Sequence, residues 1–159
     1  MNMRNLSRPD LAPLQSILEA CAVFTSAEVA CAMELLEIVL NDPQQSDYEV
    51  IVAESGGRVA GYVLFGPVPL TEGNYDLYWI ATDPGQQGRG IGRALLAEVE
   101  RILISRAARM LCLETSSQEI YQRTRNFYLN AGYLEEARIC DFYRLGDDRI
   151  TYVKRFSSH

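Results

Sequence analysis

Histidine is almost absent from this chain, because His159 is the only one among 159 residues. A Ser-His-Asp triad, a Cys-His pair or a histidine metal site therefore has no interior histidine on which to be built. Any acid–base chemistry must fall to Asp, Glu, Tyr, Lys or Cys side chains, or to water.

Cysteine is scarce as well, with four residues and no C-x-x-C pair, so we expect free thiols and no metal site. No apolar run reaches the roughly 18 residues that a membrane-spanning helix needs. The first five residues are too polar for a signal peptide. These absences predict a cytoplasmic protein.

The chain lacks an excess of positive charge. It has 15 Lys and Arg against 21 Asp and Glu, a net charge of -6 and a pI near 4.8. Nucleic acids and anionic membrane surfaces select basic faces, so we expect neither as a partner. What the chain does have is a 48% share of hydrophobic residues, which is enough for a single domain over residues 1–159.

The apolar spacing predicts two helices followed by alternating strands and helices. The order predicts an α/β fold with a sheet of mixed direction and helices on its faces. The expected helices are at about 9–21, 27–40, 91–103 and 118–130, and the expected strands are at 48–53, 58–65, 75–82, 109–115, 133–143 and 150–156.

A glycine-dense loop joins the strand at 75–82 to the helix at 91. Gly88, Gly90 and Gly92 remove side chains where backbone amides are about to become the first donors of that helix. These amides have no partner within the helix and carry the positive end of its dipole. The loop is therefore suited to an anion, most often a phosphate.

Two known phosphate loops fit this segment poorly. A P-loop ends in Gly-Lys-Ser/Thr, whereas Gly92 is followed by Arg93 and Ala94. A dinucleotide-binding loop needs a third glycine three positions after the second, and that position holds Arg93 or Leu95. An ordinary strand-to-helix turn is the structural alternative, which three alternating glycines beside two arginines disfavour.

A third pattern, Gln/Arg-x-x-Gly-x-Gly/Ala, is matched fully by Gln87-Gly88-Arg89-Gly90-Ile91-Gly92. This segment resembles the acetyl-coenzyme A loop of the GNAT N-acetyltransferase superfamily. The likeness continues in the strand end at 80–84 and in the downstream segment 126–133, and it covers residues 58 to about 143. The resemblance implies a GNAT-like fold: a mixed, mostly antiparallel sheet of six to seven strands, helices on both faces, and a splayed parallel pair formed by the strands 75–82 and 110–115.

The resemblance also implies that acetyl-CoA is the co-substrate. Backbone amides of the loop, with two arginines nearby, would cradle its diphosphate, and main-chain groups at the end of the preceding strand would pair with its pantetheine arm. The implied cofactor-binding residues are Ile80, Thr82, Gln87, Gly88, Arg89, Gly90, Ile91, Gly92 and Arg93.

Three residues are candidates for the chemistry that the resemblance implies. Tyr128 would be the general acid at the leaving sulfur, because a phenol with a pKa of about 10 is protonated at neutral pH. Glu114 or Asp76 would be the general base, with Glu114 slightly preferred because it lies so close to the end of its strand. By spacing alone, Tyr128 reads as a core aromatic. The structural alternatives for the two acids are a solvated strand-end charge for Asp76 and a structural ion pair for Glu114. Many family members carry Asn at the position of Tyr121.

The function that follows is an N-acetyltransferase that moves an acetyl group from acetyl-CoA to a primary amine by direct attack in a ternary complex. A small-molecule acceptor is preferred, because nothing in the sequence suggests a peptide groove. The alternatives are a protein or peptide acetyltransferase, a non-catalytic CoA-binding sensor and a nucleotide-binding module. A homodimer is left open.

Overall fold

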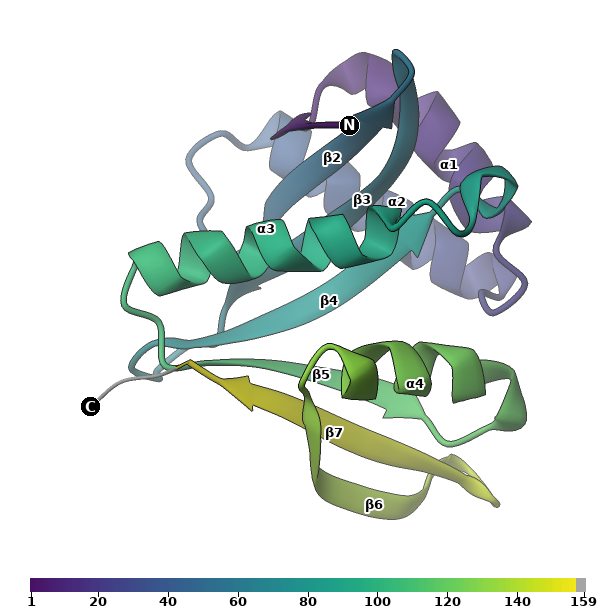
Figure 1. Cartoon of the computed structure of the whole chain (residues 1–159), viewed down its shortest axis with the longest axis vertical. Helices are drawn as coiled ribbons and strands as arrows, with labels where there is room; N and C mark the ends of the chain where they lie inside the picture. Colours follow the sequence, from purple (N-terminus) through teal and green to yellow (C-terminus); the bar gives the residue numbers. More distant parts are fainter. Residues whose placement is uncertain (157–159) are drawn as a thin grey trace.

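The computed structural model describes residues 1–156, and His159 lies outside the described residues. The strands form one seven-stranded sheet in the order β1-β2-β3-β4-β5-β7-β6 (Figure 1). The strands are β1 (Asn2–Asn5), β2 (Glu49–Ser55), β3 (Arg58–Pro67), β4 (Asn74–Thr82), β5 (Met110–Ser116), β6 (Leu134–Arg144) and β7 (Asp147–Arg155). The helices are α1 (Leu11–Ala20), α2 (Ser26–Asn41), α3 (Ile91–Ser105) and α4 (Gln122–Asn130), with short 3-10 turns η1 (Arg8–Asp10), η2 (Pro84–Gln86) and η3 (Glu119–Tyr121).

The α/β fold with a mixed sheet and a parallel strand pair is therefore confirmed, and the structure adds one strand that the hydrophobic pattern does not predict. β1 is a short edge strand of polar composition that pairs antiparallel with β2. Its Arg4 donates to Glu54 on β2 at 2.7 Å and to Asp10 at 2.8 Å. The ladder with β2 and the ion pairs of Arg4 hold this strand, and Met3 is its one apolar residue, which is why the hydrophobic pattern misses it.

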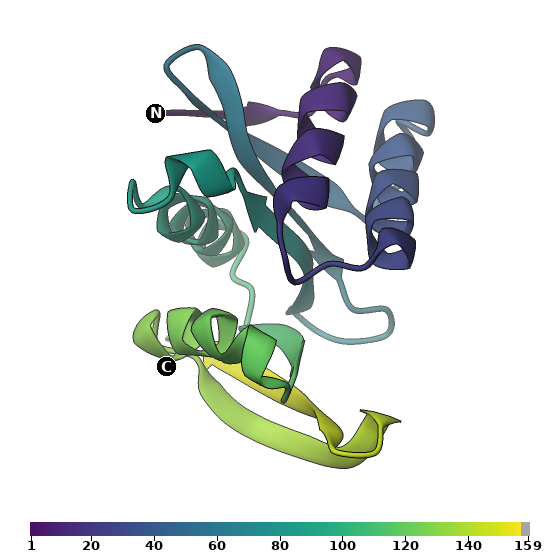
Figure 2. The same ribbon diagram turned by 90° about the vertical axis from the view of Figure 1, so that its right-hand side faces the viewer.

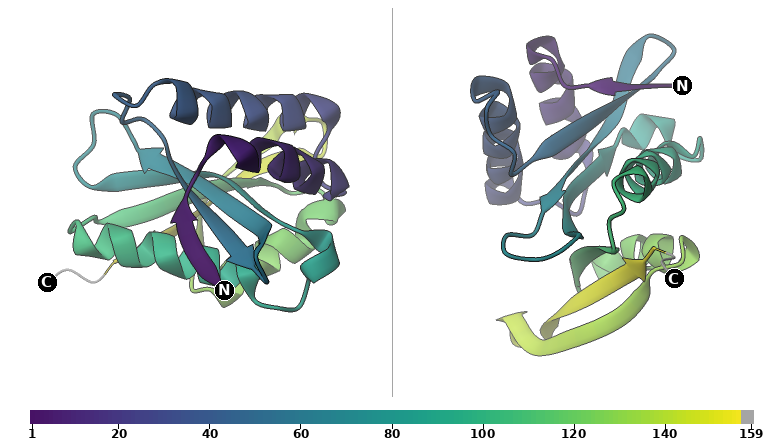
Figure 3. Two further views of the ribbon diagram at one scale, coloured as in Figure 1. Left: turned by 90° about the horizontal axis from the view of Figure 1, so that it is seen from above. Right: turned by 90° about the vertical axis from the view of Figure 1, so that its left-hand side faces the viewer.

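Helices cover both faces of the first half of the sheet. α1 and α2 pack on one face of β2, β3 and β4, and α3 packs on the other (Figures 2 and 3). In the second half, α4 packs with residues of β5 and β7 in the same hydrophobic cluster as α3. None of the helices within residues 1–156 is both long and apolar enough to cross a membrane.

The parallel strands β4 and β5 are paired only at their beginnings. Their ladder consists of Asn74 with Met110, Tyr75 with Leu111 and Asp76 with Cys112. Beyond Asp76 the two strands diverge, as Figure 1 shows for their C-terminal halves. The predicted splay is confirmed, and it leaves one edge of β4 without a strand partner along most of its length.

A bulge in β4 changes which face its side chains occupy. The register with β3 shifts between Leu77 and Trp79, so that Tyr78 has no partner on that strand. Before the bulge, Leu77 packs in the cluster under α3, and after it Trp79 and Ala81 pack in the cluster under α1 and α2. Such bulges redirect side chains, and this one lies between Asp76 and the glycine loop.

Gly66 on β3 is a point of close backbone approach. A β-carbon at this position would overlap the carbonyl oxygen of Asp47 and lie 2.9 Å from its carbonyl carbon. Gly66 is also the register partner of Asp76 on β4. The absence of a side chain here therefore lets the segment before β2 pack against β3 at the position that pairs with Asp76.

We expect Gly66→Ala to lower the free energy of unfolding by about 2 kcal/mol or more, because backbone atoms cannot move aside as a flexible side chain can. Urea denaturation followed by circular dichroism measures this. Gly85→Ala is the matched control, since a β-carbon there would meet only the Asp83 side chain, from 3.3 Å. Equal stability of the two variants would contradict the close approach.

Candidate functional site

The loop between β4 and α3 presents backbone amides that have no internal partner. The Asp83 carboxylate accepts from the Gly85 amide at 2.9 Å, and the first bond of α3 runs from the Ala94 amide to the Gly90 carbonyl at 2.9 Å. Within residues 1–156, none of the amides of residues 87–93 donates a hydrogen bond. These donors lie at the positive end of the α3 dipole, so an anion is the ligand they suit.

The three glycines of the loop do different things. Gly88 and Gly90 adopt left-handed backbone conformations, with φ of +81° and +73°, and a β-carbon at either would have nothing within 4 Å. A β-carbon at Gly92 would instead contact the Phe127 ring at 3.5 Å and the Thr82 methyl at 3.6 Å. The first two glycines therefore shape an open loop, and Gly92 lies in the packing between α3, α4 and the end of β4.

Arginines surround this loop without carboxylate partners among the described residues. Arg89 and Arg93 are exposed and form no ion pair there. Arg123, in the first turn of α4, donates to the Gln87 side chain at 3.3 Å. Arg123 is not among the site residues predicted from the sequence; it lies three residues before the matched segment 126–133, on the helix that carries Tyr128. Uncompensated guanidinium groups beside free amides favour an anion of more than one charge.

The end of β4 offers backbone groups on the side that faces away from β3. The Asp83 amide donates to the Ala60 carbonyl at 2.8 Å. Because hydrogen-bonded and non-hydrogen-bonded pairs alternate along an antiparallel ladder, the main-chain groups of Ile80 and Thr82 point away from β3, towards the side of β5. β5 does not pair with β4 there. Within residues 1–156 the only hydrogen bond to these groups comes from the Cys21 thiol, whose sulfur lies 3.6 Å from the Thr82 carbonyl oxygen.

Tyr128 on α4 is 3% exposed and packs edge-to-face against Phe127 and Tyr133, with ring centroids 5.2 and 5.8 Å away. Its hydroxyl makes no hydrogen bond within residues 1–156. The oxygen is also not among the side-chain atoms that are both inaccessible and unpaired, so it lies in the small exposed part of the residue. Burial raises the pKa of this phenol. Tyr128 is thus both a core aromatic and a protonated hydroxyl that is free to donate.

Asp76 and Glu114 lie on the same face of the sheet. Cys112 is the register partner of Asp76, and Glu114 follows two residues later on β5, where neighbours alternate between faces. Leu77 and Leu113, the adjacent residues, both pack in the cluster under α3 and α4. The two carboxylates therefore project from the opposite side, at the point where β4 and β5 separate.

The environments of the two carboxylates differ. Asp76 is partly buried and has no hydrogen bond or ion pair among residues 1–156; burial, and then the charge of Glu114, raise its pKa. Glu114 is exposed, and its Oε2 lies 3.4 Å from Nε of Arg149. Two neighbouring negative charges disfavour each other's ionisation. Here the effect is the raised pKa of Asp76, the more buried of the two.

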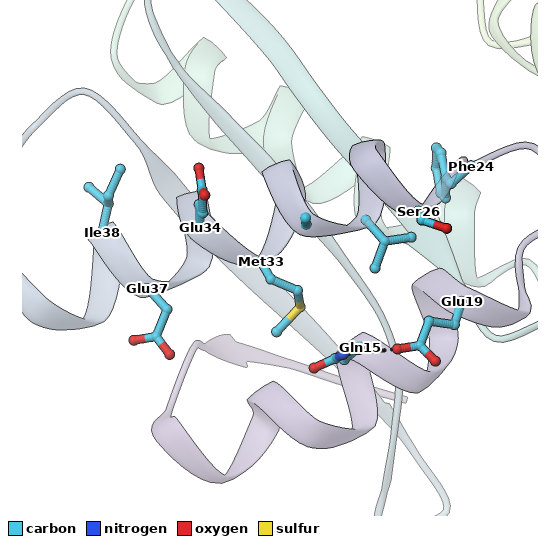
Figure 4. Close-up of a pocket in the computed structure, with 10 residues that line it drawn as sticks. Gln15, Glu19, Phe24, Ser26, Met33, Glu34, Glu37 and Ile38 are labelled. Atoms are coloured by element: carbon cyan, nitrogen blue, oxygen red, sulfur yellow. Dashed lines mark hydrogen bonds between the residues drawn. The ribbon is translucent and has the colours of Figure 1, made fainter.

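A separate groove of about 940 Å³ lies between α1 and α2 (Figure 4). Its walls combine apolar side chains such as Phe24 and Met33 with the carboxylates of Glu19, Glu34 and Glu37. It contains none of the site residues predicted from the sequence. Neither in this groove nor elsewhere in residues 1–156 do three His, Cys, Asp or Glu side chains gather where they could hold a metal ion.

Comparison with known proteins identifies a family that shares the sequence of this chain over most of its length. A sequence model described as the Acetyltransferase (GNAT) family matches residues 14–133. An uncharacterized N-acetyltransferase of Methanocaldococcus jannaschii is 31% identical over 105 residues, which are 65% of this chain. The match spans 64% of the length of that relative.

Solved structures agree with the fold. A Desulfovibrio desulfuricans structure assigned to the GNAT family of acetyltransferases is 39% identical, covers 97% of this chain and 98% of its own, and superposes with a TM-score of 0.93. An aminoglycoside 6′-N-acetyltransferase complexed with coenzyme A is 14% identical, covers 100% and 99% of the two chains, and has a TM-score of 0.75. At that identity the second likeness concerns the fold alone.

We expect the Glu114→Gln substitution to lower the pKa of Asp76, because it removes a negative charge that disfavours ionisation of its neighbour. A carboxyl-carbon NMR titration of Asp76 in both proteins measures the change. Glu34→Gln, which removes the same charge from the exposed side of α2, is the control and should leave the titration unaltered. A pKa that does not move in Glu114→Gln would show that the two carboxylates are not coupled.

Proposed function

The chain belongs to the acetyltransferase (GNAT) family, and on that premise we propose that it is an N-acetyltransferase that moves an acetyl group from acetyl-CoA to a primary amine. The amine attacks the thioester directly while both substrates are bound. The observation that carries this proposal is the free amides of residues 87–93 next to the unpaired edge of β4 at Ile80 and Thr82. One element suits a diphosphate and the other an extended amide-containing arm.

Acetyl-CoA fits these two elements by its chemistry. Its diphosphate suits the loop amides and the guanidinium groups of Arg89, Arg93 and Arg123, all of which lack carboxylate partners in the described residues. Its pantetheine arm carries amides that pair with Ile80 and Thr82 as an added strand would. The CoA complex of the aminoglycoside acetyltransferase, which shares the fold, supports the choice of ligand.

Transfer forms a bond between the amine nitrogen and the acetyl carbon and breaks the bond from that carbon to sulfur. The amine gives up a proton to a carboxylate, and the departing thiolate takes one from a donor. Tyr128 is our candidate donor, because its phenol is buried, protonated and free of other hydrogen bonds within residues 1–156. General acid catalysis of this kind contributes on the order of 100-fold or more.

Asp76 and Glu114 both stay candidates for the proton acceptor. The raised pKa of Asp76 and its lack of an ion pair among the described residues support Asp76 as the stronger base. Glu114 pairs with Arg149, which supports a role in holding negative charge beside the acceptor amine rather than in accepting its proton. This assignment reverses the slight preference for Glu114 as the base that its place in the sequence suggests.

A small-molecule acceptor is favoured over a peptide. The Tyr121 phenol donates to the Val23 carbonyl at 3.3 Å and so links η3 to the connection between α1 and α2. This link restricts the approach from that side. The alternative, a peptide acceptor, would be favoured by the acidic groove between α1 and α2, and a non-catalytic CoA sensor would bind the cofactor without turnover.

The direct test is release of free CoA thiol from acetyl-CoA in the presence of a panel of amines and peptides. We expect amine-dependent release, with the acetylated amine as the second product. Binding of acetyl-CoA without release for any acceptor would favour the sensor.

Tyr128→Phe is expected to lower kcat by about 100-fold, because the leaving thiolate loses its proton donor. The affinity for acetyl-CoA should change little, since the ring that packs in the core is retained. Steady-state kinetics and calorimetric titration measure the two effects. A parallel loss of affinity and turnover would make Tyr128 a structural residue.

Acetyl-CoA should stabilise the wild-type protein by about 2.7 kcal/mol at about 100 times its Kd, because it binds only the folded state. Gly90→Trp should abolish the resulting rise in Tm, since the indole would occupy the open space before the amides. Gly57→Trp is the matched control: its φ of +75° is nearly the same, and a β-carbon there also meets nothing within 4 Å, but it lies in the β2–β3 hairpin. If the Tm of Gly90→Trp still rises with acetyl-CoA, the diphosphate does not bind at this loop.

A further inference from the structure

We propose that Glu100, Tyr133 and Lys154 are positioning residues, which hold the Tyr128 phenol in a fixed place relative to the glycine loop. Glu100 lies on α3, Lys154 lies on β7, and Tyr133 follows the end of α4. This inference rests on the proposed function, in which Tyr128 protonates the leaving thiolate. It adds to that function the residues that set where the proton donor lies.

Tyr128 is tied to Tyr133 in two ways. At the end of α4 the Gly132 amide donates to the Leu129 carbonyl at 3.1 Å, and the Tyr133 amide donates to the Tyr128 carbonyl at 3.0 Å. This pair of bonds, with Gly132 at a φ of +95°, is the Schellman ending of a helix. The rings of Tyr128 and Tyr133 also pack edge-to-face, with centroids 5.8 Å apart. The place of the Tyr128 ring therefore depends on where Tyr133 is held.

Tyr133 is held at its hydroxyl by α3. The side chain is fully buried, and its hydroxyl donates to Oε2 of Glu100 at 2.9 Å. Burial, followed by the charge of Glu100, raises the pKa of this phenol, so it is protonated and acts as the donor. A single hydrogen bond thus joins the residue after α4 to the helix that begins at the glycine loop.

Lys154 completes the network from β7. Its Nζ donates to Oε1 of Glu100 at 2.8 Å and to the Ala131 carbonyl at 2.9 Å, and it lies 5.6 Å from the centroid of the Tyr133 ring. Ala131 is the C-cap of α4, where a positive charge also complements the negative end of the helix dipole. The ammonium group therefore fixes both the carboxylate of Glu100 and the end of α4.

A second attachment between α3 and α4 lies at the glycine loop. A β-carbon at Gly92, in the first turn of α3, would be 3.5 Å from the Phe127 ring, and this ring packs against Tyr128 with centroids 5.2 Å apart. Glu100 holds Tyr133 further along the same helix. Two attachments to one helix set both the distance and the angle of α4, and so the place of the Tyr128 hydroxyl relative to the loop amides.

The polar network does more than fill the space between α3, α4 and β7. Apolar side chains would fill it without taking a carboxylate and an ammonium group partly out of water, which costs stability. Directional hydrogen bonds, by contrast, select one arrangement of the elements that they join. A proton donor needs one arrangement, because a displacement of about 1 Å lowers the rate of a reaction between bound groups by as much as about 100-fold.

The test measures thiol release from acetyl-CoA with the amine of the panel that the wild type acetylates fastest. We expect Tyr133→Phe and Glu100→Gln each to lower kcat by about tenfold, because a displaced phenol loses part of the roughly 100-fold that Tyr128 supplies. The Kd for acetyl-CoA, measured by calorimetry, should stay unchanged, since neither side chain belongs to the glycine loop. If Tyr133→Phe does not fold, Glu100→Gln, which keeps an acceptor for the Tyr133 hydroxyl, gives the same comparison.

A double-mutant cycle separates positioning from a general structural role. In a Tyr128→Phe protein there is no phenol to position, so adding Tyr133→Phe or Glu100→Gln should change kcat by less than about twofold. A residue that only supports the fold would lower kcat equally in both backgrounds.

The chain offers a matched control for each variant. Tyr62→Phe also removes a hydroxyl from a fully buried ring, in the cluster under α1 and α2, where that hydroxyl has no partner within residues 1–156. Glu98→Gln removes the same charge from α3, where Glu98 pairs with Arg101 at 2.6 Å. Both controls should keep the wild-type kcat.

A wild-type kcat in Tyr133→Phe and Glu100→Gln, an equal loss in the Tyr128→Phe background, or a parallel loss of affinity for acetyl-CoA overturns the positioning role while the acetyltransferase proposal stands. Absence of thiol release from the wild type with every amine overturns the acetyltransferase proposal and the positioning role with it.

Discussion

Between Leu77 and Thr82, β4 has a strand partner on one side only, because its ladder with β5 ends at Asp76 and Cys112. Nearly everything in the candidate site is arranged around this early end of pairing. The main-chain groups of Ile80 and Thr82, which have no strand partner on this side, lie along it, and the glycine loop begins where the strand stops. A fully paired strand would have satisfied these groups and left no place for an extended ligand.

The site keeps many polar groups without internal partners. The loop amides, the nearby arginines and Asp76 form few or no bonds within the described residues. Each such group costs stability relative to one that is paired. The rest of the fold offsets this cost with two dense hydrophobic clusters, one on each face of the central strands. A site of this kind is most stable when a charged ligand supplies the missing partners.

The sequence predicts the central fold well, because alternating apolar residues and glycine turns are local signals. It predicts the glycine loop for the same reason, and the splay through the family resemblance. It does not predict β1, which is polar and is tied to β2 by the ion pair between Arg4 and Glu54. It does not reveal Arg123 either, because its partner Gln87 is distant in the chain. It also leaves open how Asp76 and Glu114 differ, because burial and ion pairing depend on neighbours from other strands. Which residues perform the chemistry stays a prediction.

The strand order β5-β7-β6 has a consequence for how the protein is made. β5 pairs along its whole length with β7, which follows it and α4 in the chain, and α4 packs with Ile150 and Tyr152 of that strand. We therefore expect the first half of the sheet, with the glycine loop, to assemble before β7 is synthesised, while Glu114 and Tyr128 become fixed only once β7 has emerged from the ribosome. Synthesis from the N-terminus would then form the glycine loop before the segments that carry Glu114 and Tyr128 are fixed.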